Sequence, residues 1–250
     1  TTSGEYFTLK PDAEMAGDQR TDDGASLVFE TEALDEAVSI LGRPVLTLTV
    51  TTRDPQNLCA RLVDVHPDGM ATRVSYGVLN LAHRDGNVEP EEMPAGEAVA
   101  VTLELDACGY RFGEGHKIRL SLSNAYWPLI WPATGTKGVT CDAGTLELAL
   151  PLMGDDAEPV EMPDPANPDP LPVYIEHAPS VTRRTVERNL SGNLTTYRIL
   201  EDTGAFEHPD TGLTTRQVRR ETWSVEPDDP LSARGETHWT AEMSRDGWSI

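Results

Sequence analysis

Strict alternation of apolar and polar side chains is the feature of this sequence that most restricts its fold. Between residues 117 and 123, the apolar residues Ile118, Leu120 and Leu122 occupy every second position. Successive side chains of a β-strand point to opposite faces, so this pattern predicts a strand with one buried and one solvated face. Gly115 precedes the strand and predicts a sharp turn at its start.

Similar alternation recurs along the chain and predicts strands at 26–30, 44–52, 58–66, 72–83, 99–105, 117–123 and 146–150. Residues 35–40 predict one helical turn, and no segment keeps a helical period for longer than one or two turns. A change of phase next to Gly77 predicts a bulge or a strand that crosses between sheets. Short strands separated by turns are typical of an all-β sandwich or barrel. Half-polar alternation favours a two-sheet antiparallel jelly roll, because its two sheets share one core.

Composition divides the chain into four parts. Residues 1–25 carry little pattern and are interpreted as an N-terminal arm, and residues 26–154 form the predicted jelly roll. Residues 155–172 hold six prolines and six acids without one basic residue, which predicts an extended acidic linker. Residues 173–250 predict a more polar antiparallel β-meander with a hairpin at 191–193. The chain begins without a methionine and ends at residues 248–250 on what looks like the start of a further strand, so a processed product or a fragment is expected.

The charge balance excludes several classes of partner. A formal net charge of −22 repels polyanions, so neither nucleic acid nor an anionic membrane surface is an expected partner. No apolar run approaches the roughly 20 residues that a membrane-spanning helix needs, and the sequence shows no signal peptide. The three cysteines are too few and too scattered for a disulfide framework. They are interpreted as free thiols in a reducing compartment, and the cytoplasm is expected.

The usual catalytic motifs are missing from the sequence. It contains no Gly-x-Ser-x-Gly elbow, no His-Glu-x-x-His, no Cys-x-x-Cys and no phosphate-binding glycine loop, so no catalytic residue, cofactor or metal ion is expected. His116 is predicted to anchor its turn by hydrogen bonds. Asp64 and Asp68 admit a calcium site but are better explained as a solvated turn. Three arginines on the polar side of their strands are expected to pair with surface acids: Arg61, Arg73 and Arg119.

The ring-rich loop, residues 126–132 (YWPLIWP), offers too much apolar surface to remain in water. It can fold back over the open end of its own sandwich, dock against another domain, or form a stacking platform for a sugar ring. The candidates for a domain interface or ligand platform are Tyr126, Trp127, Pro128 and Trp131.

Residues 60–84 (ARLVDVHPDGMATRVSYGVLNLAHR) resemble the C-terminal domain of the CocE/NonD hydrolase family, which includes the X-Pro dipeptidyl-peptidases. Matching segments follow the order of that domain: 17–20 (GDQR), 26–29 (SLVF), 41–45 (LGRPV), and 115–120 (GHKIRL) with the ring-rich loop after it. The resemblance covers about residues 17–152. Residues 172–250 resemble an extension of larger bacterial members.

The resemblance implies a galactose-binding-like jelly roll that follows an α/β-hydrolase domain. The serine, aspartate and histidine of such enzymes belong to the hydrolase domain, and no position here inherits their roles. The expected function is therefore that of a non-catalytic domain, which packs on the α/β-hydrolase domain of its parent chain and bounds the substrate cleft. The alternatives are an independent carbohydrate-binding module and a dimerisation domain that makes a homo-oligomer.

Overall fold

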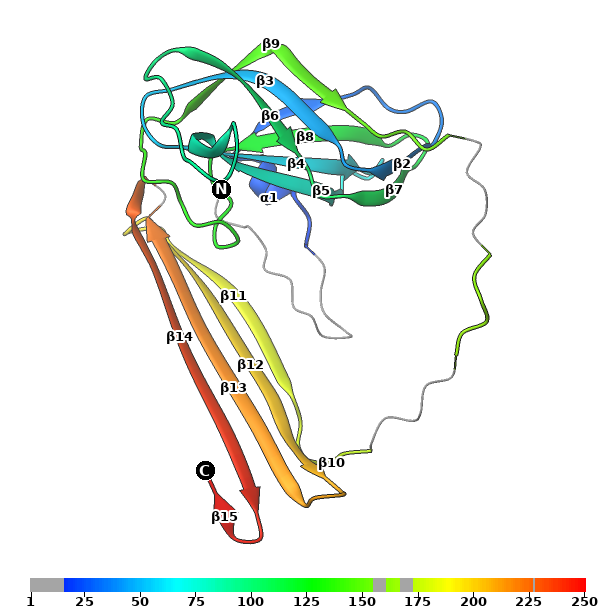
Figure 1. Cartoon of the computed structure of the whole chain (residues 1–250), viewed down its shortest axis with the longest axis vertical. Coiled ribbons are helices and arrows are strands. Elements are labelled where there is room, and N and C mark those ends of the chain that lie inside the picture. Colours follow the sequence, from blue (N-terminus) through cyan, green and yellow to red (C-terminus); the bar gives the residue numbers. More distant parts are fainter. Residues whose placement is uncertain (1–15, 155–160, 167–172, 227) are drawn as a thin grey trace. The chain divides into compact units, whose positions relative to one another are not determined.

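The computed structural model describes residues 16–154, 161–166, 173–226 and 228–250. Its chain divides into two compact units, the first built mainly from residues before 155 and the second mainly from residues after 160 (Figure 1). Much of the predicted N-terminal arm and most of the predicted acidic linker lie outside the described residues. Within the linker, residues 161–166 form neither helix nor strand.

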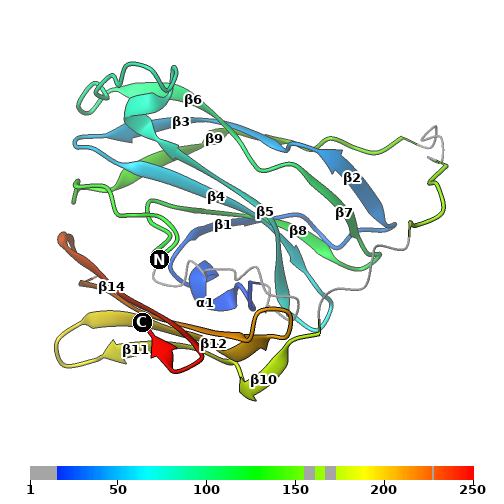
Figure 2. The same ribbon diagram turned by 60° about the horizontal axis from the view of Figure 1, so that its bottom comes forward.

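The first unit is an antiparallel two-layer β-sandwich, which confirms the predicted fold class. One layer is the four-stranded sheet β1 (Leu27–Glu30), β8 (Lys117–Ser123), β4 (Asn57–Val65) and β5 (Ala71–Asn80), in that order. The other holds the three-stranded sheet β6 (Ala98–Glu104), β3 (Val45–Thr52) and β9 (Val139–Ala149), and a ribbon of β2 (Val38–Gly42) and β7 (Cys108–Phe112). Figure 2 shows these two layers from a second side.

The core lies between the two layers and follows the predicted alternation. In β3, Leu46, Leu48 and Val50 are buried while the residues between them are only partly covered. They share one cluster with Leu62 and Leu120 of the four-stranded sheet. Burial of these side chains supplies the main free energy that holds the layers together.

Two local predictions differ from the structure. Residues 38–42 form strand β2, which pairs with β7, where a helical turn was expected. The β4–β5 register shifts between Leu62 and Val63, so Val74 is the bulged residue and the position next to Gly77 is regular. Glycine is instead required at position 77 by close packing, because a Cβ there would lie 2.7 Å from the backbone oxygen of Glu104. Glycine permits this close approach of two strands.

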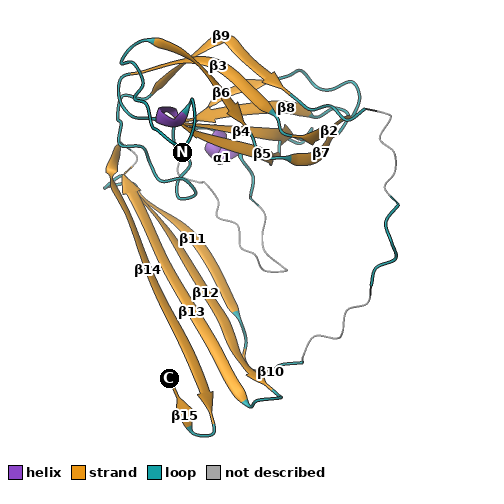
Figure 3. Cartoon of the chain, in the orientation of Figure 1, coloured by secondary structure: helices purple, strands orange, loops and turns teal. Residues whose placement is uncertain are grey.

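Helices contribute little to the fold, as Figure 3 shows. Helix α1 (Arg20–Asp23) and the 3₁₀ turn η1 (Leu81–His83) are each about one turn long. Among the described residues, no helix has the length and apolar character needed to cross a membrane.

The second unit is one antiparallel sheet, as expected for the polar β extension. Its elements are β10 (Ile175–Ala178), β11 (Val181–Asn189), β12 (Leu194–His208), β13 (Leu213–Glu226), β14 (Asp229–Arg245) and β15 (Trp248–Ser249). Strands β10, β11 and β13 all pair with β12. The predicted hairpin joins β11 to β12, where Asn189 Oδ1 accepts the backbone N–H groups of Ser191 and Gly192. Few apolar side chains are buried in this unit: Tyr197, Ile199, Val218, Val225 and Ala233.

Candidate functional site

The outer face of the four-stranded sheet carries a buried polar network, here called the Arg61 network. Arg61 in β4 lies directly opposite Ser121 in β8 and faces away from the apolar core. Its side chain is fully buried, and its guanidinium lies 3.1 Å from Asp23 Oδ1 and 3.9 Å from Asp22 Oδ2. The guanidinium also donates to Gln19 Oε1 at 2.9 Å. The expectation of surface pairing was therefore wrong for Arg61, because the segment around α1 covers this part of the sheet.

Asp23 is the acceptor that joins the network. Besides Arg61, its carboxylate accepts from Arg119 Nη1 at 2.5 Å and from Ser121 Oγ at 2.6 Å. A buried arginine is tolerated only where such acceptors replace its water. The acids at residues 22 and 23, interpreted from sequence as part of a patternless arm, are thus part of the folded interior.

The ring-rich loop packs Tyr126 against the same outer face. Arg73 Nη1 donates to the Tyr126 hydroxyl at 2.5 Å, and the Arg61 guanidinium lies 5.5 Å from the centre of the ring. Burial raises the pKa of Tyr126 to about 12. The two arginines oppose this rise, because they favour the ionised form. Tyr126 is therefore an internal contact of the first unit.

The remaining rings of the loop differ in exposure. Trp127 is buried and Pro128 is half-buried, whereas 53% of Trp131 is exposed. The two indoles meet edge to face with their centres 5.3 Å apart. Of the four candidates, Trp131 is thus the residue that presents a large ring to solvent.

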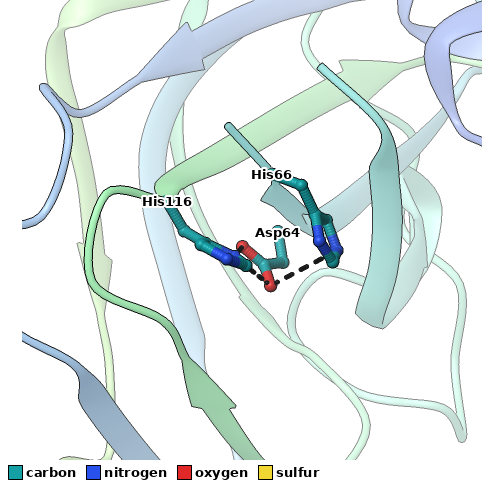
Figure 4. A group of neighbouring side chains, drawn as sticks. All are labelled: Asp64, His66 and His116. Carbon is teal, nitrogen blue, oxygen red and sulfur yellow. Dashed lines mark hydrogen bonds and ion pairs between the residues drawn. The ribbon is translucent and has the colours of Figure 1, made fainter. Parts of the chain in front are cut away.

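A second polar cluster, here called the Asp64 cluster, consists of Asp64, His66 and His116 (Figure 4). Asp64 pairs with Ile118 and faces the core side of β4, where only 1% of its side chain is exposed. Its carboxylate accepts from the Tyr110 hydroxyl at 2.9 Å and contacts His116 Nδ1 at 2.8 Å. The expectation of a solvated turn was therefore wrong for Asp64. It holds for Asp68, whose Oδ1 accepts the N–H of Met70.

The glycine-rich turn before β8 sets the position of His116. Gly115 has a φ of +78°, a conformation that favours glycine. A Cβ on Gly113 would lie 2.9 Å from the His116 ring, so glycine at 113 leaves room for that ring. The prediction that His116 anchors this turn by hydrogen bonding is confirmed by its contact with Asp64.

His66 completes the cluster from the end of β4. Its Nε2 lies 3.0 Å from Thr72 Oγ1 and 3.7 Å from Asp64 Oδ2. The ring centres of His66 and His116 are 4.6 Å apart. Among the described residues, these two histidines and Asp64 form the one group of three side chains whose donor atoms are close enough to share a metal ion.

Sequence reasoning missed this cluster because its members are far apart in the chain. Asp64 and His116 are separated by 52 residues and meet only through the β4–β8 pairing. One signal was available: Asp64 falls at the same alternate positions as Ala60 and Leu62, which face the core. An acid at an apolar position requires a buried partner.

Comparison with known proteins places these sites in a family. Residues 3–161 match the family described as the X-Pro dipeptidyl-peptidase C-terminal non-catalytic domain. The chain belongs to this family. The matched range contains both the Arg61 network and the Asp64 cluster, whereas nearly all of the second unit follows it.

Two known hydrolases are similar to this chain over part of their own length. Cocaine esterase of Rhodococcus sp. (strain MB1 Bresler) is 31% identical over 114 residues, which cover 45% of this chain and 20% of the esterase. The chain thus matches about a fifth of the length of that relative. A solved α-amino acid ester hydrolase aligns with a TM-score of 0.51 and 20% identity over 55% of this chain and 27% of its own, which supports the sandwich fold.

The Asp64 cluster in this X-Pro dipeptidyl-peptidase C-terminal domain predicts a response to alkaline pH. Burial, and then the hydrogen bond and charge of Asp64, raise the pKa of Tyr110 to about 12 from 10.0. Between these two values the Tyr110 hydroxyl stays protonated in the folded state but ionises in the unfolded state. Its contribution to the free energy of unfolding is therefore complete below pH 10.0 and is lost as pH rises to about 12. Tyr110→Phe is expected to flatten this decline. Urea unfolding at a series of alkaline pH values measures the free energy of unfolding of both proteins. If it falls equally with pH in both, Tyr110 does not cause the decline.

Proposed function

We propose that this chain is the non-catalytic part of a larger serine hydrolase, and that it packs on the catalytic α/β-hydrolase domain and bounds its substrate cleft. Two findings support the proposal: the family is described as non-catalytic, and the matched region is one fifth of a longer esterase. The whole protein would cleave ester bonds, or amide bonds as the family name indicates. Its nucleophile would come from the catalytic domain.

The exposed ring of Trp131 is the observation that carries this proposal. It projects from a loop whose neighbouring rings are buried, and Trp127 supports it edge to face. A large ring held in place loses little entropy when a partner covers it, so tryptophan is enriched among the residues that dominate binding energy. Trp131, with the half-buried Pro128 beside it, would fill a pocket on the catalytic domain.

The test measures binding between this chain and the catalytic domain encoded in the same gene, by isothermal titration calorimetry. Trp131→Ala is expected to weaken binding by about tenfold or more, the effect of losing a central interface ring. Trp239→Ala, which removes a similarly exposed tryptophan of the second unit, is the control and should bind like the wild type. Unchanged binding of Trp131→Ala, with the unfolding midpoint preserved, would reject the proposed interface.

Self-association is a second candidate function, and the second unit favours it. Its sheet exposes apolar side chains, among them Val181 and Val186 on β11 and Trp239 and Met243 on β14. Exposed strands with apolar side chains are prone to pair with other chains. Sedimentation velocity over a range of concentrations tests this: a dimer that Val186→Lys dissociates supports it, and a monomer at every concentration removes it.

A carbohydrate platform is less well supported, because the faces of Tyr126 and Trp127 are covered. A glycan array that compares the wild type with Trp131→Ala tests it directly. We also propose a cytoplasmic location. Cys59, Cys108 and Cys141 are free thiols, which is consistent with a reducing compartment.

A further inference from the structure

We propose that Asp64, His66 and His116 bind one divalent transition-metal ion, best represented by Zn²⁺, with water completing the coordination. The site is separate from the ring-rich loop, and the inference does not rest on the proposed function. It extends the hydrogen-bonding role of His116, because the same nitrogen that contacts Asp64 can bind a metal ion once it loses its proton.

The distances between donor atoms suit a single small ion. The donor atoms of the three residues all lie within 4.8 Å of one another. His116 Nδ1 is 2.8 Å from Asp64 Oδ1, and His66 Nε2 is 3.7 Å from Asp64 Oδ2. Zinc bonds to nitrogen and oxygen place the ligands of a tetrahedral site about 3.3 Å apart. The observed separations lie on both sides of this value, so small rotations of the two imidazole rings would close the site.

The three ligands come from the end of β4 and from the turn before β8 (Figure 4). Asp64 and His66 are two positions apart at the end of β4, so their side chains leave the strand on the same side. His116 stands two positions before Ile118, the partner of Asp64, and reaches the same side from β8. Tyr110, in the opposite layer, donates to Asp64 Oδ2 and fixes the carboxylate. Hydrogen bonds of this kind orient the ligands of natural metal sites.

Charge and chemistry both favour a metal ion here. The Asp64 carboxylate is almost completely buried, and a buried negative charge is costly unless a positive charge lies beside it. Two imidazoles and one carboxylate are donors that favour zinc, copper or nickel over calcium or magnesium, which prefer oxygen ligands alone. The side chains of His66 and His116 are 27% and 19% exposed. Part of each imidazole therefore faces solvent, where water can complete the coordination.

The competing explanation is that a proton on His116 alone balances Asp64. The two explanations differ in the role of His66, which lies 3.7 Å from the carboxylate and is a weak partner without a metal ion. A metal site needs both histidines, whereas the hydrogen bond between Asp64 and His116 does not need His66. Substitution of His66 therefore separates them.

The test is a zinc titration of the full chain, without an affinity tag and after treatment with a chelator, followed by calorimetry. The wild type is expected to bind one ion per chain, and His66→Gln is expected to bind it more than about 100-fold more weakly. The matched control is His238→Gln, because His238 is exposed on β14 and distant in sequence from the cluster. It should bind like the wild type. Absence of zinc binding, or equal binding by His66→Gln, would overturn the proposal.

A second variant leaves all three ligands in place. Gly113→Ala adds a Cβ that would lie 2.9 Å from the His116 ring and must displace it. We expect zinc affinity to fall by about 10- to 100-fold, as for other changes that disturb the orientation of a ligand. The visible spectrum of the Co²⁺ form reports the geometry directly, and the tetrahedral bands expected for the wild type should weaken in this variant. A Co²⁺ spectrum identical to that of the hydrated ion in the wild type would contradict the site.

Discussion

Asp23→Asn is expected to lower the free energy of unfolding by about 3–5 kcal/mol, the loss found when one partner of a buried ion pair is removed. Asp23 forms an ion pair with Arg61 and accepts from Arg119 and Ser121, and the Arg61 side chain has no exposed surface. Asparagine has nearly the same shape but turns one acceptor oxygen into a donor. That NH₂ group would face guanidinium donors, so the buried charge of Arg61 would lose its main counter-charge.

Asp18→Asn is the matched control for this substitution. Asp18 also pairs with an arginine, Arg20, but the two side chains are 31% and 62% exposed. An exposed pair contributes about 0–1 kcal/mol, because water screens both charges. Urea denaturation of the three proteins gives the comparison. Equal losses for both variants would show that Asp23 behaves as a surface acid and that the Arg61 network does not stabilise the fold.

Leu62→Ala is expected to lower the free energy of unfolding by about 2–5 kcal/mol, the range for a large side chain removed from a packed core. Leu62 is fully buried in β4 and shares the main cluster with Leu46 of β3 and Leu120 of β8. Truncation would leave a cavity between the two layers, because strands fixed on both sides by hydrogen bonds cannot close it.

Leu41→Ala removes the same atoms from the partly solvated strand β2, where 64% of Leu41 is exposed. Its expected effect is within about 0.5 kcal/mol, as for other surface substitutions. The two leucine variants are compared by urea denaturation under the same conditions. A loss at Leu62 no larger than that at Leu41 would mean that the core does not lie between the layers.

Much of the fold was predictable because alternation is a local signal. The pattern of β8 predicted which of its residues face the core, and Ile118, Leu120 and Leu122 are all buried there. Strand β7 was missed although Cys108, Tyr110 and Phe112 alternate along it, because part of its partner β2 was interpreted as a helical turn. The turn at Ser191–Asn193 was predicted correctly, since turn chemistry also depends on neighbouring residues only.

The polar sites were less predictable, because their chemistry depends on what covers a side chain. Arg61 and Arg119 occupy solvent-facing positions of their strands, and alternation alone predicts that both meet water. The segment around α1 changes this, since it brings Asp22 and Asp23 onto that face. Within the Arg61 network, Gln19 is 42 residues from Arg61 and Asp23 is 96 residues from Arg119, separations that no local pattern spans.

The sequence by itself determined the class of fold, the positions of most strands, and the resemblance to a family that the comparison with known proteins then established. Only the tertiary structure decided which polar residues are buried and which donors meet. Pairing β4 with β8 brings Asp64 beside His116 across 52 residues. The physical reason is that strand formation follows from neighbours along the chain, whereas a buried charge or a metal site depends on groups that only folding brings together.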